Sequence, residues 1–106
     1  MRRSPRFPQR LVVRFSAGDG AWLRSGCTLD LSDGGLFLNS RFLLPEGTRV
    51  SGSVELPGGS RIEVGAVVSW SRPTPKAIND PARGGMGLKL VWAERAYFEL
   101  LSSIAA

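Results

Sequence analysis

Apolar and polar residues alternate along two neighbouring stretches in the middle of the chain. Val50, Val54 and Leu56 are separated by polar residues or glycine, and the same period of two runs through residues 62–70. This period is typical of a strand with one buried face. The turn-forming sequence PGG at positions 57–59 separates the stretches. We therefore predict that they form a β-hairpin.

Four more strands are predicted from shorter apolar runs, at residues 11–15, about 22–31, 36–39 and 86–92. The sequence AGDG at positions 17–20 permits the positive φ angles of a tight hairpin. A longer loop is predicted over residues 72–85, which contain three prolines, two arginines and an asparagine. Six short strands in a small chain close most economically as an antiparallel barrel, because closure leaves no exposed edge.

The period changes at the end of the chain. Apolar residues recur there at helical spacing, as Ala93, Ala96, Tyr97, Leu100, Leu101 and Ile104. This spacing predicts a short amphipathic helix. The predicted fold class is all-β, a small six-stranded antiparallel β-barrel with a short C-terminal α-helix. A chain of 106 residues fits one domain, divided into a basic arm (1–10), the barrel (11–92) and the helix (93–105).

Positive charge is concentrated at one end of the chain. The net charge is +5, and residues 1–14 contain five arginines and no acidic residue. The rest of the chain is balanced, whereas proteins that wrap nucleic acid usually spread basic residues along a face or groove. We therefore expect no DNA or RNA partner. We also expect that nothing local holds the arginine-rich segment, since its charges repel and its prolines cannot donate to a sheet.

The residue inventory argues against catalysis. The chain has no histidine and a single cysteine, Cys27, so a Ser-His-Asp or Cys-His site cannot form and zinc lacks its usual ligands. We expect no enzyme activity and no metal or cofactor. No apolar run approaches the roughly 18 residues of a membrane helix, so we expect a cytoplasmic protein without membrane insertion.

Two motifs in this frame resemble those of a known family. The stretch RRSPRFP holds Arg2 and Arg6 in RxxxR spacing, and DLSDGG holds Asp30, Ser32 and Gly35 in DxSxxG spacing. With the later stretches GLFL, LPEGTRV, VSW and GGMGLKLVW, the chain resembles a PilZ domain over nearly its whole length. The resemblance implies a bacterial cytoplasmic receptor for the second messenger cyclic di-GMP that signals to an effector protein and catalyses nothing.

The resemblance assigns ligand contacts to the arginines. Arg2 and Arg6 carry the RxxxR roles, Arg3 is an adjacent auxiliary, and Arg10 is a further candidate outside the motif. Arginine suits a cyclic dinucleotide because its planar fork pairs with phosphate or with guanine O6 and N7, and its face stacks on a base. The alternative is a basic segment that serves solubility.

The second motif supplies the other candidate contacts. Asp30 is an acceptor for the N1–H and N2–H donors of guanine, Ser32 is a small donor and acceptor beside it, and Gly35 lets a ligand approach the backbone. The same residues are also what an ordinary turn prefers. The two interpretations are compatible, because a turn can hold a site.

Trp70 ends a predicted strand just before a loop that carries Arg72 and Arg83, two possible helpers. An indole there could stack on a guanine, as PilZ domains often place a contact residue at this point. In the alternating pattern of this strand, however, Trp70 falls on the same face as Val64 and Val68. Packing of Trp70 in the core is therefore at least as well supported as contact with a ligand.

The resemblance implies two function classes. The first is a cyclic di-GMP receptor or adaptor in which the arginine arm closes over the nucleotide on the barrel surface. The second is a ligand-independent PilZ-like module that binds a partner protein, for instance through the apolar face of the helix.

Overall fold

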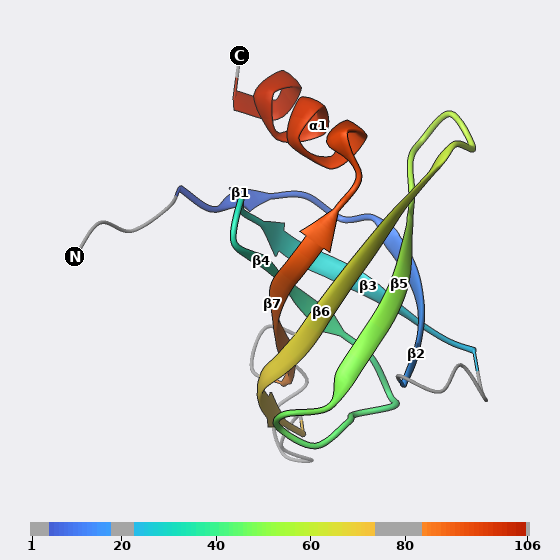
Figure 1. The fold of residues 1–106 in the computed structure, drawn as a ribbon, viewed down its shortest axis with the longest axis vertical. Coiled ribbons are helices and arrows are strands. Elements are labelled where there is room, and N and C mark those ends of the chain that lie inside the picture. Colours follow the sequence, from blue (N-terminus) through green and yellow to red (C-terminus); the bar gives the residue numbers. More distant parts are fainter. Residues whose placement is uncertain (1–4, 18–22, 74–83, 106) are drawn as a thin grey trace.

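Seven strands and one helix make up the part of the chain that the structure describes (Figure 1). The structure is a computed structural model that describes residues 5–17, 23–73 and 84–105. The elements are β1 (Phe7–Pro8), β2 (Val12–Ala17), β3 (Arg24–Leu31), β4 (Gly35–Asn39), β5 (Arg49–Glu55), β6 (Arg61–Arg72), β7 (Gly85–Ala93) and α1 (Arg95–Ala105).

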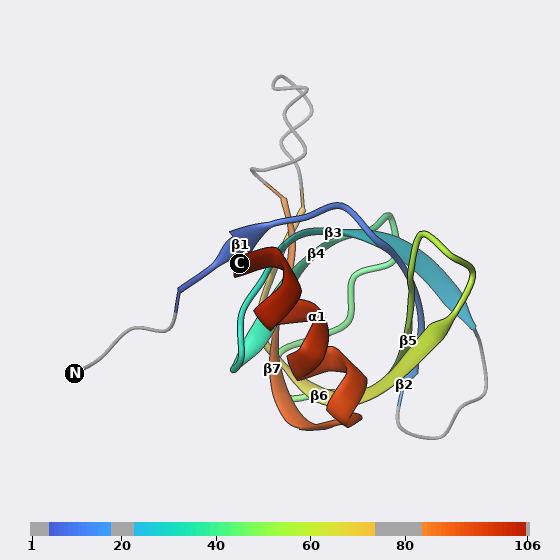
Figure 2. The same cartoon turned by 90° about the horizontal axis from the view of Figure 1, so that it is seen from above.

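Six of the strands form a closed antiparallel barrel. The order around it is β3-β2-β5-β6-β7-β4, and β4 pairs back with β3 to close the ring. Figure 2 looks down the barrel axis and shows α1 lying across one end of the barrel. The predicted fold class, a six-stranded antiparallel barrel with a short C-terminal helix, is confirmed.

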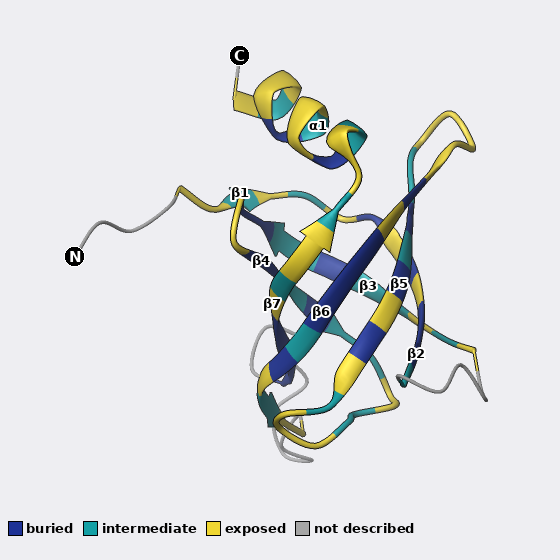
Figure 3. Ribbon diagram, viewed as in Figure 1, coloured by how far each residue is buried: buried dark blue, intermediate teal, exposed yellow. Residues whose placement is uncertain are grey.

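The barrel interior is filled by the apolar residues of alternating positions. Figure 3 shows buried and exposed residues alternating along β5, where Val50 and Val54 point inward. Ile62 and Val64 do the same on β6. Among the described residues, the other fully or nearly buried apolar ones are Leu11, Val13, Phe15, Leu31, Leu36, Leu38, Ala66, Val68, Met86, Leu88, Tyr97 and Leu101.

Helix α1 closes the end of the barrel with one apolar face. Tyr97 and Leu101 are its buried residues, and a spacing of four places both on the same side of a helix. Within the residues that the structure describes, no helix has the length and apolar character needed to cross a membrane.

Strand β1 is an element that the sequence did not predict. Phe7 lies opposite Leu31 and Pro8 opposite Asp30, at the end of β3. Strand β2 pairs with the earlier part of β3, so β1 continues the same edge. A proline is tolerated at such an edge because its missing N–H need not face the neighbouring strand.

The side chain of Thr28 fastens the chain between β1 and β2. Its hydroxyl donates to the Gln9 carbonyl at 2.6 Å and accepts the Leu11 N–H at 2.8 Å, and Thr28 itself is fully buried. The expectation that nothing local holds the arginine-rich segment is therefore wrong from Phe7 onward. Strand pairing and this buried hydroxyl hold it.

Candidate functional site

An ion pair joins the two sequence motifs. The Arg6 Nε donates to Asp30 Oδ1 at 2.9 Å, and Nη2 lies 2.7 Å from the same oxygen. The pairing of β1 with β3 brings them together, because Arg6 immediately precedes β1 and Asp30 lies opposite Pro8. Arg2 and Arg3 lie outside the described residues.

Ser32 belongs to the turn between β3 and β4. Its N–H donates to the Gly35 carbonyl at 2.8 Å, and its hydroxyl lies 3.2 Å from the same oxygen. The residue is 3% exposed, so its hydroxyl closes the turn that carries the DxSxxG motif. The turn interpretation is therefore correct for Ser32, and it is compatible with a site beside the turn.

Gly35 is needed where β4 approaches β7. A Cβ built on Gly35 would lie 2.2 Å from the Leu88 carbonyl oxygen of β7, far inside any ordinary contact. We expected glycine here for the approach of a ligand. The structure gives a different reason, the close approach of the neighbouring strands β4 and β7.

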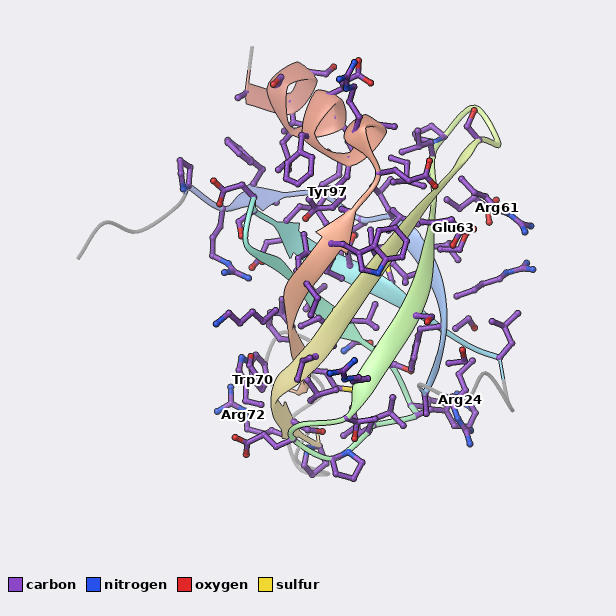
Figure 4. The ribbon with its side chains drawn as sticks, viewed as in Figure 1. Arg24, Arg61, Glu63, Trp70, Arg72 and Tyr97 are labelled. Carbon is purple, nitrogen blue, oxygen red and sulfur yellow. The ribbon has the colours of Figure 1, made fainter. Side chains whose placement is uncertain are left out.

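Tyr97 of α1 reaches this turn from the inside of the molecule. Its hydroxyl donates to the Ser32 carbonyl at 2.7 Å, with the Gly35 carbonyl at 3.3 Å. Burial raises the pKa of the phenol from 10.0 to about 12, although the hydrogen bond to Ser32 and the charge of Arg6 oppose the rise. Figure 4 shows Tyr97 between α1 and the barrel.

This shifted pKa predicts a loss of stability in strong base. The pKa of the Tyr97 phenol is higher in the folded protein than in the unfolded chain. Its contribution to the stability of the folded state is therefore complete below pH 10 and is lost as the pH rises toward 12, because in this range the unfolded state releases the proton more readily. We expect the free energy of unfolding to fall by about 2 kcal/mol between these limits. Urea titrations of the wild type and Tyr97→Phe measure it, since the variant lacks this component. Parallel pH profiles for the two proteins would contradict the assignment.

A β-bulge turns Trp70 to the outside of the barrel. Val68 lies opposite Leu88 and Trp70 opposite Gly87, so Ser69 is an extra residue on β6. Residues that pair across antiparallel strands share a face, and Leu88 points inward. Gly87 and Trp70 therefore face outward, and the core alternative for Trp70 is wrong.

The Trp70 indole covers the glycine opposite it. A Cβ at Gly87 would lie 2.0 Å from the indole Nε1. The ring meets Phe37 edge-on, with centroids 5.0 Å apart, and the Arg72 guanidinium lies 5.0 Å from its centroid. These neighbours hold the indole as a fixed, partly exposed aromatic group on the barrel surface.

A pocket of about 490 Å³ lies between the two motifs and this tryptophan. It is lined by Arg6, Ser32, Gly34, Gly35, Leu36, Ser69, Trp70, Gly87, Leu88 and Lys89. Asp30 and Arg10 line a neighbouring pocket of about 640 Å³ together with Phe37. The Arg6–Asp30 pair and the Phe37–Trp70 contact connect the two pockets, so six of the predicted site residues lie on one surface.

Sequence reasoning missed Lys89, Phe37 and Tyr97. Lys89 alternates with the apolar residues Leu88 and Leu90 on β7, a pattern that predicts an outward side chain but not the pocket it lines. Nothing in the sequence indicates that Phe37 meets Trp70. Tyr97 was assigned to the helix for its apolar spacing alone.

The groups at this surface suit an anionic ligand with planar rings. They offer guanidinium and ammonium donors, a carboxylate acceptor and aromatic faces. Among the described residues, no group of three or more His, Cys, Asp or Glu side chains could hold a metal ion.

Solved structures share the fold at low sequence identity. The PilZ domain of CeSA from a cellulose-synthesizing bacterium superposes with a TM-score of 0.63 at 20% identity, covering 95% of each chain. The Bacillus subtilis inhibitor of motility, MotI/DgrA, gives 0.71 at 19% identity and covers 99% of this chain. The match spans 50% of that longer protein.

Sequence comparisons identify the family. A comparison with curated proteins gave no significant match. The family model described as the PilZ domain, however, matches residues 1–100, nearly the whole chain. The chain therefore belongs to the PilZ domain family.

Proposed function

We propose that this protein binds cyclic di-GMP and acts as a receptor or adaptor in bacterial second-messenger signalling. PilZ domains form a family of cyclic di-GMP receptors. The observation that carries the proposal for this chain is the Arg6–Asp30 ion pair at the edge of a pocket that Trp70 also lines. The pocket volume of about 490 Å³ lies within the usual range for small-molecule sites.

Arg6 is placed to hold both Asp30 and a ligand. A guanidinium has five N–H donors, and the contacts with Asp30 use Nε and Nη2. The Arg6 side chain is 53% exposed, so its other donors have access to a phosphate or to guanine O6 and N7. Lys89 adds a second cation on the same pocket.

Trp70 and Arg72 provide flat surfaces for a base. Stacking on an aromatic ring contributes about 1–3 kcal/mol per base, and an arginine plane stacks similarly. The Gly87 and Phe37 contacts fix the indole before any ligand arrives. Less ordering is then needed on binding, which favours affinity.

Asp30 is proposed to select guanine, through acceptance of its N1–H and N2–H donors. Arg2 and Arg3, upstream of the described residues, are proposed to close over the nucleotide and pair with its phosphates, while Arg10 supports the adjoining pocket. We place the protein in the cytoplasm, where an effector protein reads the bound state, and we assign it no catalytic step.

Calorimetric titration with cyclic di-GMP and cyclic di-AMP tests the proposal. We expect cyclic di-AMP to bind at least about tenfold more weakly. Adenine lacks the two donors from which Asp30 would accept hydrogen bonds, and the loss of hydrogen bonds to a charged group costs more than about 1.4 kcal/mol of binding free energy. Equal affinities would refute the role of Asp30. No binding of either nucleotide would refute the receptor function.

The second candidate is a ligand-independent interaction module. Its support is the exposure of two adjacent apolar side chains on β7, Val91 at 68% and Trp92 at 52%. Exposed apolar patches often mark protein interfaces. The same titration separates the candidates, since a module of this kind gives no heat with cyclic di-GMP.

A further inference from the structure

Helix α1 is hydrogen-bonded to the turn that carries the DxSxxG motif. The Tyr97 side chain is 0% exposed, and its hydroxyl donates to the Ser32 carbonyl at 2.7 Å with the Gly35 carbonyl at 3.3 Å. These two carbonyls stand at the beginning and the end of the turn. A single hydroxyl on the helix therefore fixes the separation of the turn's two ends.

The same helix packs against the other segments around the pocket. It contacts β1, which directly follows Arg6, and β7, which carries Gly87 and Lys89 (Figures 1 and 2). The Tyr97 hydroxyl bonds to the carbonyl of Ser32, two residues after Asp30 of the ion pair. Helix α1 thus touches the arm, the turn and the strand whose residues line one pocket.

We propose that Tyr97 is a positioning residue for the nucleotide site, and that its hydroxyl links ligand binding to the attachment of α1. This inference rests on the proposed cyclic di-GMP function. Tyr97 touches no ligand in this proposal. It sets the geometry of Ser32 and Gly35, and through them the pocket edge on which the ligand lies.

Removal of the Tyr97 hydroxyl would affect the Ser32 and Gly35 carbonyls differently. The Gly35 carbonyl retains the Ser32 N–H at 2.8 Å, whereas the Ser32 carbonyl loses its 2.7 Å partner inside the protein. A buried acceptor without a partner favours rearrangement toward water. The turn then populates its binding geometry less often, and the apparent affinity falls by that fraction.

The first test compares Tyr97→Phe with the wild type by calorimetry. We expect the dissociation constant for cyclic di-GMP to rise about fivefold or more, the lower end of typical coupling between sites. Ile104→Val is the matched control, because it trims one carbon from a partly buried residue of the same helix and leaves the Tyr97 hydroxyl in place. Its affinity should stay within twofold of the wild type.

The second test uses the wild type alone, and it therefore decides the matter even if Tyr97→Phe does not fold. Thermodynamic linkage is reciprocal, so cyclic di-GMP should slow the hydrogen exchange of α1 amides. The β5–β6 hairpin between Glu55 and Arg61, whose residues line neither of the two pockets, serves as the internal reference. We expect cyclic di-GMP to slow amide hydrogen exchange in α1 by a factor at least about five times that in the hairpin.

The outcomes separate this inference from the proposed function. If the wild type gives no heat with cyclic di-GMP, the receptor function fails and the linkage fails with it. If the wild type binds but folded Tyr97→Phe binds equally well, only the linkage is overturned. Equal slowing of α1 and the reference hairpin would overturn it as well.

Discussion

Replacing Arg6 with alanine is expected to weaken cyclic di-GMP binding about ten- to a hundredfold, because a charge-assisted hydrogen bond contributes about 1.5–3 kcal/mol. Arg6 lines the pocket and also holds Asp30 through Nε and Nη2. The substitution therefore removes a ligand donor and releases the carboxylate that we assign to guanine. Calorimetric titration of the variant and the wild type measures the loss.

The same substitution should hardly change the stability of the fold. The Arg6 side chain is 53% exposed, and ion pairs screened by solvent contribute about 0–1 kcal/mol. The arm stays attached through β1 and through Thr28, whose hydroxyl bonds to Gln9 and Leu11. A weakened affinity with an unchanged melting temperature is the combined result expected.

Arg61→Ala is the matched control for charge. Arg61 is an exposed arginine at the opposite end of β6 from Trp70 and Arg72 (Figure 4). Its removal lowers the net charge equally but leaves the pocket intact, so the affinity should remain within about twofold. A similar loss for Arg61→Ala and Arg6→Ala would show that general charge attraction, not a contact at Arg6, drives binding.

The barrel was predictable because buried and exposed residues alternate along its strands. On β5 the inward positions Val50, Gly52 and Val54 alternate with exposed or partly exposed ones, and on β2 Val13 and Phe15 do the same. Burial on one face enforces this pattern in each strand separately. The helix was equally visible, since Tyr97 and Leu101 share one buried face.

Strand β1 and the orientation of Trp70 were not predictable by such reasoning. Two residues including a proline give no alternation, and β1 exists only because β3 extends beyond β2 and offers a free edge. Trp70 changes face because Ser69 is inserted opposite β7. A bulge depends on two paired strands, so the alternation within one strand cannot reveal it.

The candidate site was predictable as a list of residues but not as a set of contacts. Motif spacing singled out Arg6 and Asp30, and the family resemblance singled out Trp70; the folding of the barrel then brought them to two linked pockets. The attachment of Tyr97 to the Ser32 carbonyl joins residues that are 65 positions apart. Only the packing of α1 over the barrel end creates that contact, so no local pattern encodes it.

Gly35→Ala is expected to destabilise the barrel more than the surface substitutions Arg6→Ala and Arg61→Ala. The added Cβ would lie 2.2 Å from the Leu88 carbonyl oxygen and 3.3 Å from its carbon. Both are backbone atoms of β7, and they cannot turn away as a flexible side chain does. Strands β4 and β7 must therefore separate at the seam where Gly35 lies opposite Lys89.

The expected cost is about 2–3 kcal/mol, as for other overpacked positions, which corresponds to a fall in melting temperature of roughly 10 °C or more for a domain of this size. Differential scanning calorimetry of Gly35→Ala measures it. The same shift at the seam displaces Lys89 and Leu88, two residues of the pocket wall, so cyclic di-GMP affinity should fall in parallel.

Gly34→Ala provides the control, one residue earlier in the same turn. A Cβ at Gly34 meets nothing within 4 Å, and Gly34 does not have a positive φ. Alanine there should leave the stability unchanged or raise it by up to about 1 kcal/mol, because the unfolded chain loses freedom. If both variants melt like the wild type, the approach of β4 to β7 is not what requires glycine at position 35. If Gly35→Ala alone is destabilised, the glycine of the DxSxxG motif is required by the close approach of β4 to β7.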